Sequence, residues 1–334
     1  MKVDGGIGSD LGKAGAQAKR LEDLGYHGAM TAETANDPFF PLLLGAQETE
    51  KIELMTSIAV AFSRTPMNLA NIGHDLNSFS KGRFVLGLGS QIRPHITKRF
   101  SMPWSKPAAR MHEFISAMHA IWDCWHNGTP LSFEGDFYTH SLMTPMFTPT
   151  DNQYGAPKVF LAAVGPMMTE VAGEVADGVI IHAFTTQKYF KEVTSPAIAK
   201  GLEKAGRNRD AFEISYPCFM VTGRTEEEFN ATKQAVCKQI AFYGSTPAYA
   251  PVLGVHGWGD LQPELNGLSK QGKWDEMGTL ITDEILEEFA IVGEMNEVAD
   301  KFKNRWGGLI DRTSGYLPTV DDDQAREMVQ KLSA

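Results

Sequence analysis

Two short apolar runs, each ending in polar side chains, constrain this chain most. Residues 80–91 read SKGRFVLGLGSQ and end at Ser90 and Gln91, and residues 24–33 read LGYHGAMTAE and end at Glu33. Each run has the length of a buried parallel strand, is too short for a helix, and follows a helical pattern. An α/β barrel carries its chemistry at the carboxyl ends of parallel strands, so both runs predict rim residues of such a site.

Strand-like and helical patterns alternate along the chain, which favours parallel βαβ units. The expected strands cover about 2–7, 27–32, 52–60, 84–89, 158–164, 178–184, 212–221 and 308–312. The second expected helix begins at Pro38. The others cover about 11–24, 66–79, 107–126, 166–176, 187–205, 225–243, 294–306 and 320–332. We therefore predict an α/β protein with a single (β/α)8 barrel domain over residues 1–334. A doubly wound sheet is the alternative.

Residues 244–281 fit neither repeat. They hold Tyr249, His256, Trp258 and Trp274 among several Gly and Pro residues. Long loops are usually lids, pocket walls or subunit contacts, and all three interpretations stay open here. Residues 130–139 are expected to form a small hairpin that turns at Gly135.

Composition and charge exclude several classes of function. Apolar residues make up 43% and charged residues 22%, which is normal for a globular protein. No apolar run approaches the length of a bilayer span, and no signal core follows Met1, so we expect a cytoplasmic protein. A net charge of −10 without a basic run disfavours nucleic acid and anionic membranes as partners. Three scattered cysteines without a CxxC motif predict neither disulfides nor zinc.

Two further segments suggest where a ligand binds. Residues 162–178 read AAVGPMMTEVAGEVADG, so Gly165 and Pro166 join an expected strand to a helix. Such a helix start binds anions, commonly phosphate, although an ordinary turn is an equal alternative. Residues 87–90, GLGS, are a weak dinucleotide signal and are better explained by backbone packed closely under a flat ring.

The histidines and one carboxylate are candidates for proton transfer and ligand contact. His95 follows the fourth expected strand and His182 ends the sixth. Glu33 is placed to position a proton or a ring edge, and a salt bridge to Arg64 or Arg93 is its alternative role. The chain lacks an HExxH or GxSxG motif, which disfavours metal-dependent and serine hydrolysis.

Three ordered segments resemble signatures of the bacterial-luciferase-like flavin and deazaflavin oxidoreductases. They are LEDLGYHGAMTAE, SFSKGRFVLGLGS and VFLAAVGPMMTEVAGEVADGVI. The segments TSIAVAFSRTP, GSQIRPHI, MPWSKPAARM, AFYGSTPAY and HGWGDL further resemble a subfamily that is assigned to coenzyme F420. The resemblance covers about residues 2–312 and is weakest in 244–281.

The resemblance implies a tricyclic ring at the carboxyl ends of the barrel strands. Ser57 and Ile58 match the family's bulge behind the ring, where the peptide bond is often cis. The other implied cofactor contacts are Thr34, Ser90, Gln91, Ala163, Val164, Gly165, Pro166, His182, Ala183 and Phe184. Many members have a histidine where this chain has Thr34, so Glu33 and His95 are the expected catalytic residues.

The resemblance further implies an oxidoreductase that transfers a hydride between C5 of F420 and a small organic substrate. An FMN-dependent monooxygenase that uses dioxygen is the first alternative, and a non-catalytic binding barrel is the second. We see no match to the lysines of the family's sugar-phosphate dehydrogenases, so a sugar phosphate is not expected as the substrate. A homodimer without a metal site is expected.

Overall fold

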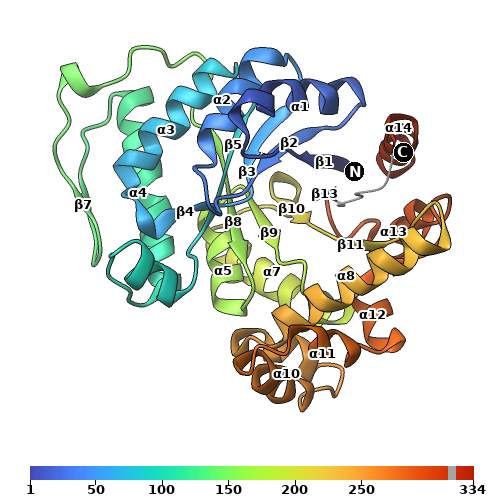
Figure 1. The fold of residues 1–334 in the computed structure, drawn as a ribbon. Helices are drawn as coiled ribbons and strands as arrows, with labels where there is room; N and C mark the ends of the chain where they lie inside the picture. The colour runs from blue at the N-terminus through green and yellow to red at the C-terminus, as the bar shows by residue number, and fades with distance from the viewer. Residues whose placement is uncertain (315–320) are drawn as a thin grey trace.

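A closed barrel of parallel strands forms the centre of the computed structural model, which describes residues 1–314 and 321–334 (Figure 1). Neighbours around the barrel pair in parallel, and the pairings of β3 with β5 and of β13 with β1 close the ring. The predicted barrel is therefore confirmed, and the doubly wound sheet is excluded. The eight strands are β1 (Lys2–Gly6), β2 (Gly28–Thr31), β3 (Glu53–Thr56), β5 (Phe84–Gly89), β8 (Lys158–Ala163), β9 (Gly178–Ile181), β10 (Glu213–Tyr216) and β13 (Arg312–Thr313).

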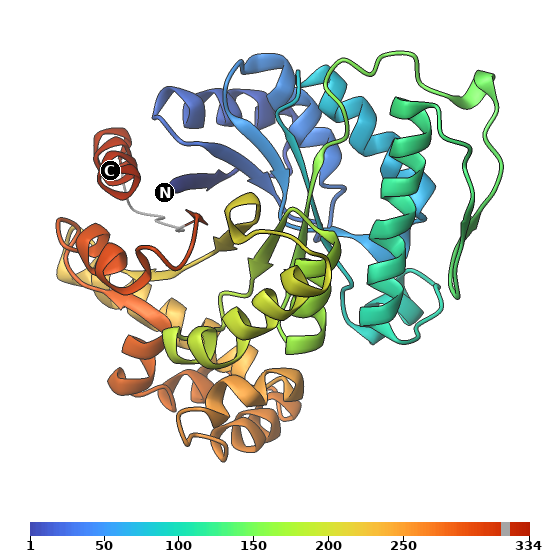
Figure 2. The same cartoon turned by 180° about the vertical axis from the view of Figure 1, so that it is seen from behind.

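Helices surround the barrel strands in both views (Figures 1 and 2). Local signals fix several helix starts: Thr65 caps α3 ahead of Pro66, and Thr225 caps α8. The predicted last helix begins at residue 320, which lies outside the described residues. The helices are α1 (Leu11–Asp23), α2 (Phe39–Glu48), α3 (Pro66–Phe79), α4 (Pro107–Asn127), α5 (Pro166–Val175), α6 (Gln187–Tyr189), α7 (Ser195–Lys204), α8 (Glu226–Gly244), α13 (Val298–Trp306) and α14 (Asp322–Ser333).

Two predicted strands are interrupted in the structure. The third divides into β3 and β4 (Ala59–Val60) at the peptide bond between Ser57 and Ile58, which is cis as the resemblance implied. The seventh divides into β10 and β11 (Phe219–Val221) around Pro217, which has no backbone N–H to donate. β11 pairs with β12 (Ala290–Val292), a strand that the sequence pattern missed. The predicted hairpin is present as β6 (Phe133–Glu134) and β7 (Thr139–His140).

Residues 244–281 are mostly helical rather than a loop. They contain α9 (Ala250–Gly254), α10 (Leu261–Lys270) and α11 (Trp274–Thr279), and α12 (Asp283–Phe289) follows. In Figure 1 this layer lies at the lower end of the molecule, beside α8. Its buried apolar side chains form a core that is separate from the main core of the barrel. The helices are too short to show a clear 3.6-residue period in the sequence.

A buried ion network closes the amino end of the barrel interior. The side chains of Arg312 and Asp4 are both 0% exposed and share two hydrogen bonds of 2.7 Å. The Arg312 guanidinium also donates to Glu53 at 2.8 Å and to Glu213 at 3.4 Å. Lys2 pairs with both of these glutamates. Charges removed from water must be paired in this way to be tolerated, so the network depends on each member.

A layer of apolar side chains lies next to the ion network inside the barrel. Alternate residues of each strand point inward, which brings Met55, Val85, Phe160 and Ile180 together as a small core. The Arg312 guanidinium lies 5.7 Å from the centre of the Phe160 ring and so joins the two layers. Ligands can therefore enter the barrel only from its carboxyl end.

We predict that Gly28→Ala lowers the free energy of unfolding by about 2 kcal/mol, because the ion network has no room to move. A Cβ at residue 28 would overlap the Asp4 carboxylate and lie 2.8 Å from an Arg312 nitrogen. The matched control is Gly6→Ala on β1, where a Cβ would meet no described atom within 4 Å. Denaturant unfolding measures both variants, and equal midpoints would contradict this role of Gly28.

Candidate active site

The carboxyl end of the barrel has an apolar floor. Met30, Ile58 and Ala162 pack on the small interior core and remain partly exposed. Gly6 of β1 is exposed at the same end, and a Cβ there would meet no described atom within 4 Å. Small and partly exposed apolar residues at this end form a surface that suits a flat ring.

Strand register brings the predicted rim residues to this one mouth. The Glu33 N–H donates to the carbonyl of Ile58 at 3.0 Å, which joins the chain after β2 to the bulge before β4. The pairing of Val60 with Gly89 sets that bulge beside the end of β5, where Ser90 follows. The other predicted rim residues on these strands are Thr34, Ser57 and Gln91.

The opposite half of the rim is set by β8 and β9. Ala163 is in register with Ile181, so Val164 and His182 are the next neighbours where the two strands end. Gly165 and Pro166 then begin α5, and Ala183 and Phe184 follow His182. The sequence-predicted residues of this half therefore lie at the same end of the barrel as those of the first half.

Gly87 and Gly89 make room for the protein itself, not for a ligand. A Cβ on Gly87 would overlap the carbonyl of Thr56, and a Cβ on Gly89 would lie 2.8 Å from Cδ1 of Ile58. The Thr56 hydroxyl also donates to the carbonyl of Gly87 at 2.7 Å. The expectation that these glycines lie directly under a ring is therefore corrected, because Ile58 occupies the place above Gly89.

Glu33 is held in a salt bridge. Its Oε2 accepts hydrogen bonds from Arg64 Nη1 at 2.7 Å and from the Val60 N–H at 2.8 Å, and its side chain is only 6% exposed. Arg64 also donates to Asp37 at 3.0 Å. This is the alternative role that the sequence allowed for Glu33, and it makes the carboxylate a brace between the rim and the bulge.

His95 and the residues before it lie on an irregular segment after β5. Ile96 is buried and anchors the π-helical turn of residues 95–99, whereas the His95 side chain is exposed. Gln91 has a φ of 58°, and its side-chain oxygen accepts the N–H of Ile92 at 3.0 Å. The Ser90 hydroxyl donates to the carbonyl of Gln91 at 3.1 Å. Local bonds therefore use the polar groups of Ser90 and Gln91 in part, whereas the His95 side chain is exposed.

The start of α5 is open to an anion. Gly165 is the N-cap residue, and no described side chain caps the helix there. A Cβ on Gly165 would meet no described atom within 4 Å, and Pro166 is exposed. Unpaired amides and the helix dipole attract negative charge, so the space at Gly165 suits a phosphate.

His182 is a neutral member of an aromatic cluster. Its Nδ1 accepts the N–H of Phe184 at 3.0 Å, so the neutral ring carries its proton on Nε2, which lies 3.4 Å from the Tyr249 hydroxyl. The His182 ring stacks on Tyr249 at 4.8 Å and meets the edge of Tyr243 at 4.5 Å. Burial lowers the pKa of His182 to about 4, and burial raises the pKa of Tyr249 to about 12.

Tyr249 is a rim residue that sequence reasoning noted but did not place. It belongs to residues 244–281, and its ring reaches His182 at the end of β9. A second contact, 2.8 Å between His256 Nε2 and Thr186 Oγ1, ties the same segment to the barrel. Both contacts favour the pocket-wall interpretation of the segment. Strand alternation, in contrast, gives a signal that would have found Met30 and Ala162 on the floor.

Other features of the surface do not compete with the mouth. A concavity outside the barrel, between α1 and α14, contains two ion pairs, Arg20 with Asp322 and Lys19 with Asp23. No three His, Cys, Asp or Glu side chains in the described parts of the chain could together hold a metal ion. None of the described helices is long and apolar enough to cross a bilayer. The predicted cellular location stays a prediction.

Comparisons with known proteins agree with this architecture. Residues 2–312 match the model of a family described as luciferase-like monooxygenase. The chain is 54% identical over 312 residues to an uncharacterized protein of Mycobacterium tuberculosis, covering 93% of this chain and 92% of the relative. It is 27% identical over 291 residues to 5,10-methylenetetrahydromethanopterin reductase of Archaeoglobus fulgidus, covering 85% and 82%. The solved coenzyme F420-dependent tetrahydromethanopterin reductase of Methanopyrus kandleri superposes with a TM-score of 0.78 at 22% identity, covering 98% and 97%, and so shows the shared fold.

A double-mutant cycle tests whether Glu33 braces the rim. We expect Glu33→Gln and Arg64→Met to be non-additive in unfolding free energy, with a coupling of about 2 kcal/mol. Among the described residues, Arg64→Met leaves the buried Glu33 carboxylate with only the Val60 N–H, and Glu33→Gln leaves Arg64 with only the partly exposed Asp37 as its charged partner. The control cycle uses the exposed pair Lys238 and Asp275, which should couple by less than about 1 kcal/mol. Additive effects at Glu33 and Arg64 would show that the salt bridge does not hold the rim.

The lowered pKa of His182 predicts a loss of stability in acid. The folded ring stays neutral down to about pH 4, whereas the unfolded chain takes up this proton below about 6.5. Stability therefore falls as pH decreases from about 6.5 to 4, and His182 accounts for up to roughly 3 kcal/mol of that fall. His182→Gln should reduce the difference between the free energies of unfolding measured at neutral pH and near pH 4. An NMR titration of the ring with a midpoint near 6.5 would contradict the prediction.

Proposed function

This chain belongs to the luciferase-like monooxygenase family, and on that basis we propose that it is an oxidoreductase that uses coenzyme F420 to transfer a hydride to or from a small organic substrate. The observation that carries the proposal is the pairing of two features at one mouth. An open apolar floor, at Met30, Ile58 and Ala162, faces the same opening as the uncapped start of α5. A flat ring joined to a phosphate requires both features.

The residues present fit such a cofactor. Ile58, raised above Gly89, would support the ring from below, and Gly165 with the first amides of α5 would hold the phosphate. Ser57, Thr34, Ser90 and Gln91 would border the ring on one side of the mouth. The corresponding border on the other side is Ala163, Val164, Pro166, His182, Ala183 and Phe184. F420 supplies the hydride chemistry at C5 when it is bound, and the chain supplies position and electrostatics.

The polar side chains of the rim would have different roles in the reaction. We assign Glu33 to holding the bulge through Arg64, so its part in the reaction is indirect. His95 is exposed on the segment after β5, and we propose that it exchanges the proton of the substrate oxygen, a role that typically contributes 10²–10⁴-fold to the rate. Tyr249 and His182 are both neutral near pH 7, so the one N–H of His182 faces the Tyr249 hydroxyl, and that hydroxyl would donate its own proton in a hydrogen bond to the substrate oxygen.

The same fold also suits an FMN-dependent monooxygenase, since the family's description names a monooxygenase. Two titrations separate the alternatives: F420 and FMN are added in turn to the purified protein, and absorbance and fluorescence report binding. We expect tight binding of F420 and weak binding of FMN. Micromolar binding of FMN without binding of F420 would refute the proposal. A bound and reducible F420 that never passes its hydride to a panel of alcohols and carbonyls would instead support a non-catalytic binding barrel.

We predict that Gly165→Ala weakens F420 binding about tenfold, which corresponds to about 1.4 kcal/mol, because the new methyl group enters the space for the phosphate. The fold should be unaffected, since the φ of −91° at Gly165 suits any residue and a Cβ meets no described atom within 4 Å. Gly267→Ala in α10 is the control, because a Cβ is equally unopposed there and the site is elsewhere. Unchanged affinity of Gly165→Ala would remove α5 from the proposed phosphate site.

A further inference from the structure

One stretch of this acidic protein contains no acidic residue. The chain has 41 Asp and Glu residues and a net charge of −10, yet none lies between Asp75 and Glu113. The stretch includes the whole segment after β5, which carries four exposed cations. They are Arg93, Lys98, Arg99 and Lys106.

These four cations are not neutralised by the described parts of the chain. Arg99 donates to the carbonyl of Thr34, and none of the four has an acidic partner within 4 Å among the described residues. The two acids of the neighbouring rim, Glu33 and Asp37, are both committed to Arg64. The segment therefore presents uncompensated positive charge on a protein whose overall charge would repel anions.

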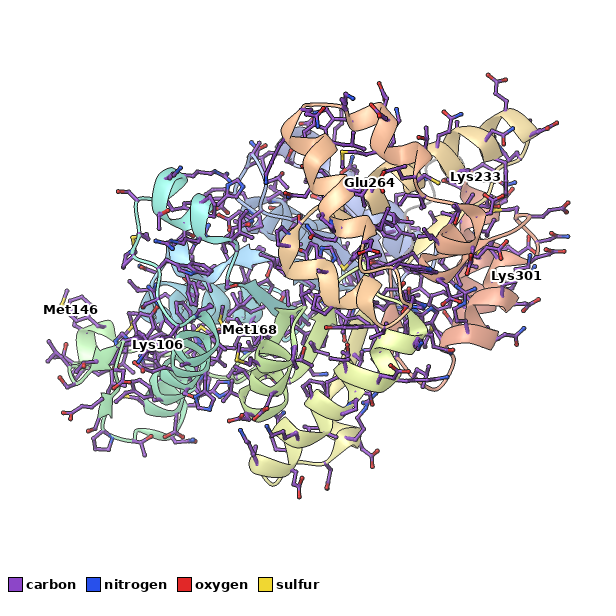
Figure 3. All side chains as sticks on the ribbon, turned by 90° about the horizontal axis from the view of Figure 1, so that it is seen from below. Lys106, Met146, Met168, Lys233, Glu264 and Lys301 are labelled. Atoms are coloured by element: carbon purple, nitrogen blue, oxygen red, sulfur yellow. The ribbon has the colours of Figure 1, made fainter. Side chains whose placement is uncertain are left out.

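Helix geometry places the end of this segment beside the start of α5. α4 and α5 follow parallel strands and touch where His112 Nε2 lies 3.3 Å from Glu174 Oε2. Lys106 precedes that contact by six residues on α4, and Met168 precedes it by six residues on α5. Figure 3 labels Lys106 and Met168 on neighbouring helix ends, in agreement with this register. The cationic segment thus runs from the rim after β5 to the proposed phosphate site.

The backbone of the segment is held in one shape. Left-handed residues fix its turns, with φ of 58° at Gln91, 54° at Ser101 and 36° at Lys106. Ile96 is buried, and the Arg110 guanidinium donates to the carbonyl of Pro103 at 2.7 Å. A preformed group of cations binds a chain of anions with less loss of freedom than a mobile loop would.

We propose that residues 93–106 bind the row of carboxylates that follows the phosphate in F420, that is, its tail of linked glutamates. The proposal rests on the proposed function, since it needs the phosphate to sit at Gly165. Each exposed cation contributes weakly, but several act together and the attraction falls with added salt. The tail, rather than the ring, is then what distinguishes F420 from FMN on this side of the mouth.

The test compares F420 that carries five glutamates with the form that carries none, by fluorescence titration at low and high ionic strength. We expect the long-tailed form to bind about tenfold more tightly at low ionic strength. The triple variant Arg93→Gln, Lys98→Gln, Lys106→Gln should lose that preference while still binding the tail-less form. The control removes the same charge elsewhere through Lys13→Gln, Lys51→Gln and Lys270→Gln, which are exposed on other elements, and should keep the preference.

The outcomes separate this proposal from the cofactor assignment. Equal affinity for both forms in the unmodified protein, or a triple variant that weakens both forms equally, overturns the tail site while the F420 assignment stands. If neither form binds, the cofactor assignment fails, and a peptide of five γ-linked glutamates is titrated against the protein alone. Binding of the peptide that the triple variant abolishes supports the cationic segment as an oligocarboxylate site. No binding, or binding that the triple variant leaves unchanged, overturns it.

Discussion

The contact between Arg312 and Asp4 is the interaction on which the rest of the structure depends. It joins the last strand of the barrel to the first, and therefore closes a ring that the chain leaves open until its end. Both side chains are fully buried, so either one alone would be an unpaired charge in the interior. Gly28 must lack a side chain for the pair to fit. Because this network fills the amino end, the barrel interior is open to a ligand from its carboxyl end.

Between that network and the mouth, each layer follows from the two-residue repeat of the strands. From the amino end to the carboxyl end, the charged layer is followed by Met55 and Phe160 and then by the partly exposed Met30 and Ala162. The inward positions of β9 end at His182. The irregular part is the crossing of Ile58 over Gly89, which lifts an apolar side chain into the mouth. Glu33 and Arg64 hold that irregular part in place from the rim. The regular strands thus position the rim residues, and the bulge at Ile58, held by Glu33 and Arg64, shapes the floor.

Most of the barrel could be predicted from the sequence, because its strands are short apolar runs and several helices begin at Pro or Thr signals. The exceptions have physical reasons. β12 was missed because it pairs with β11, about seventy positions earlier, and not with a strand of the barrel. The helices of residues 244–281 were missed because each is only two or three turns long or shorter. The cis bond at Ser57 came from the family resemblance alone, since nothing in the local residue pattern specifies it.

The candidate site was predictable in location and less so in roles. Strand ends identify Glu33, Gly165 and His182 as rim residues, but their partners come from other elements. Arg64 is 31 positions from Glu33, and Tyr249 is 67 positions from His182, so neither contact has a local signature. Free charge is equally hidden, since the sequence shows where acids are missing but not which cations stay unpaired.

The separate core of the helical layer has a consequence for how this enzyme diversifies. α8 and α10–α12 pack on one another through their own buried side chains, and the layer reaches the mouth through two histidine contacts. Substitutions inside that core would reshape the aromatic wall while barrel closure and the apolar floor at Met30, Ile58 and Ala162 remain unchanged. Because the layer has its own core, it can open locally while the barrel stays folded, and that opening would control how substrates reach the mouth. Selection for new substrates would then change the helical layer while the barrel keeps its structure.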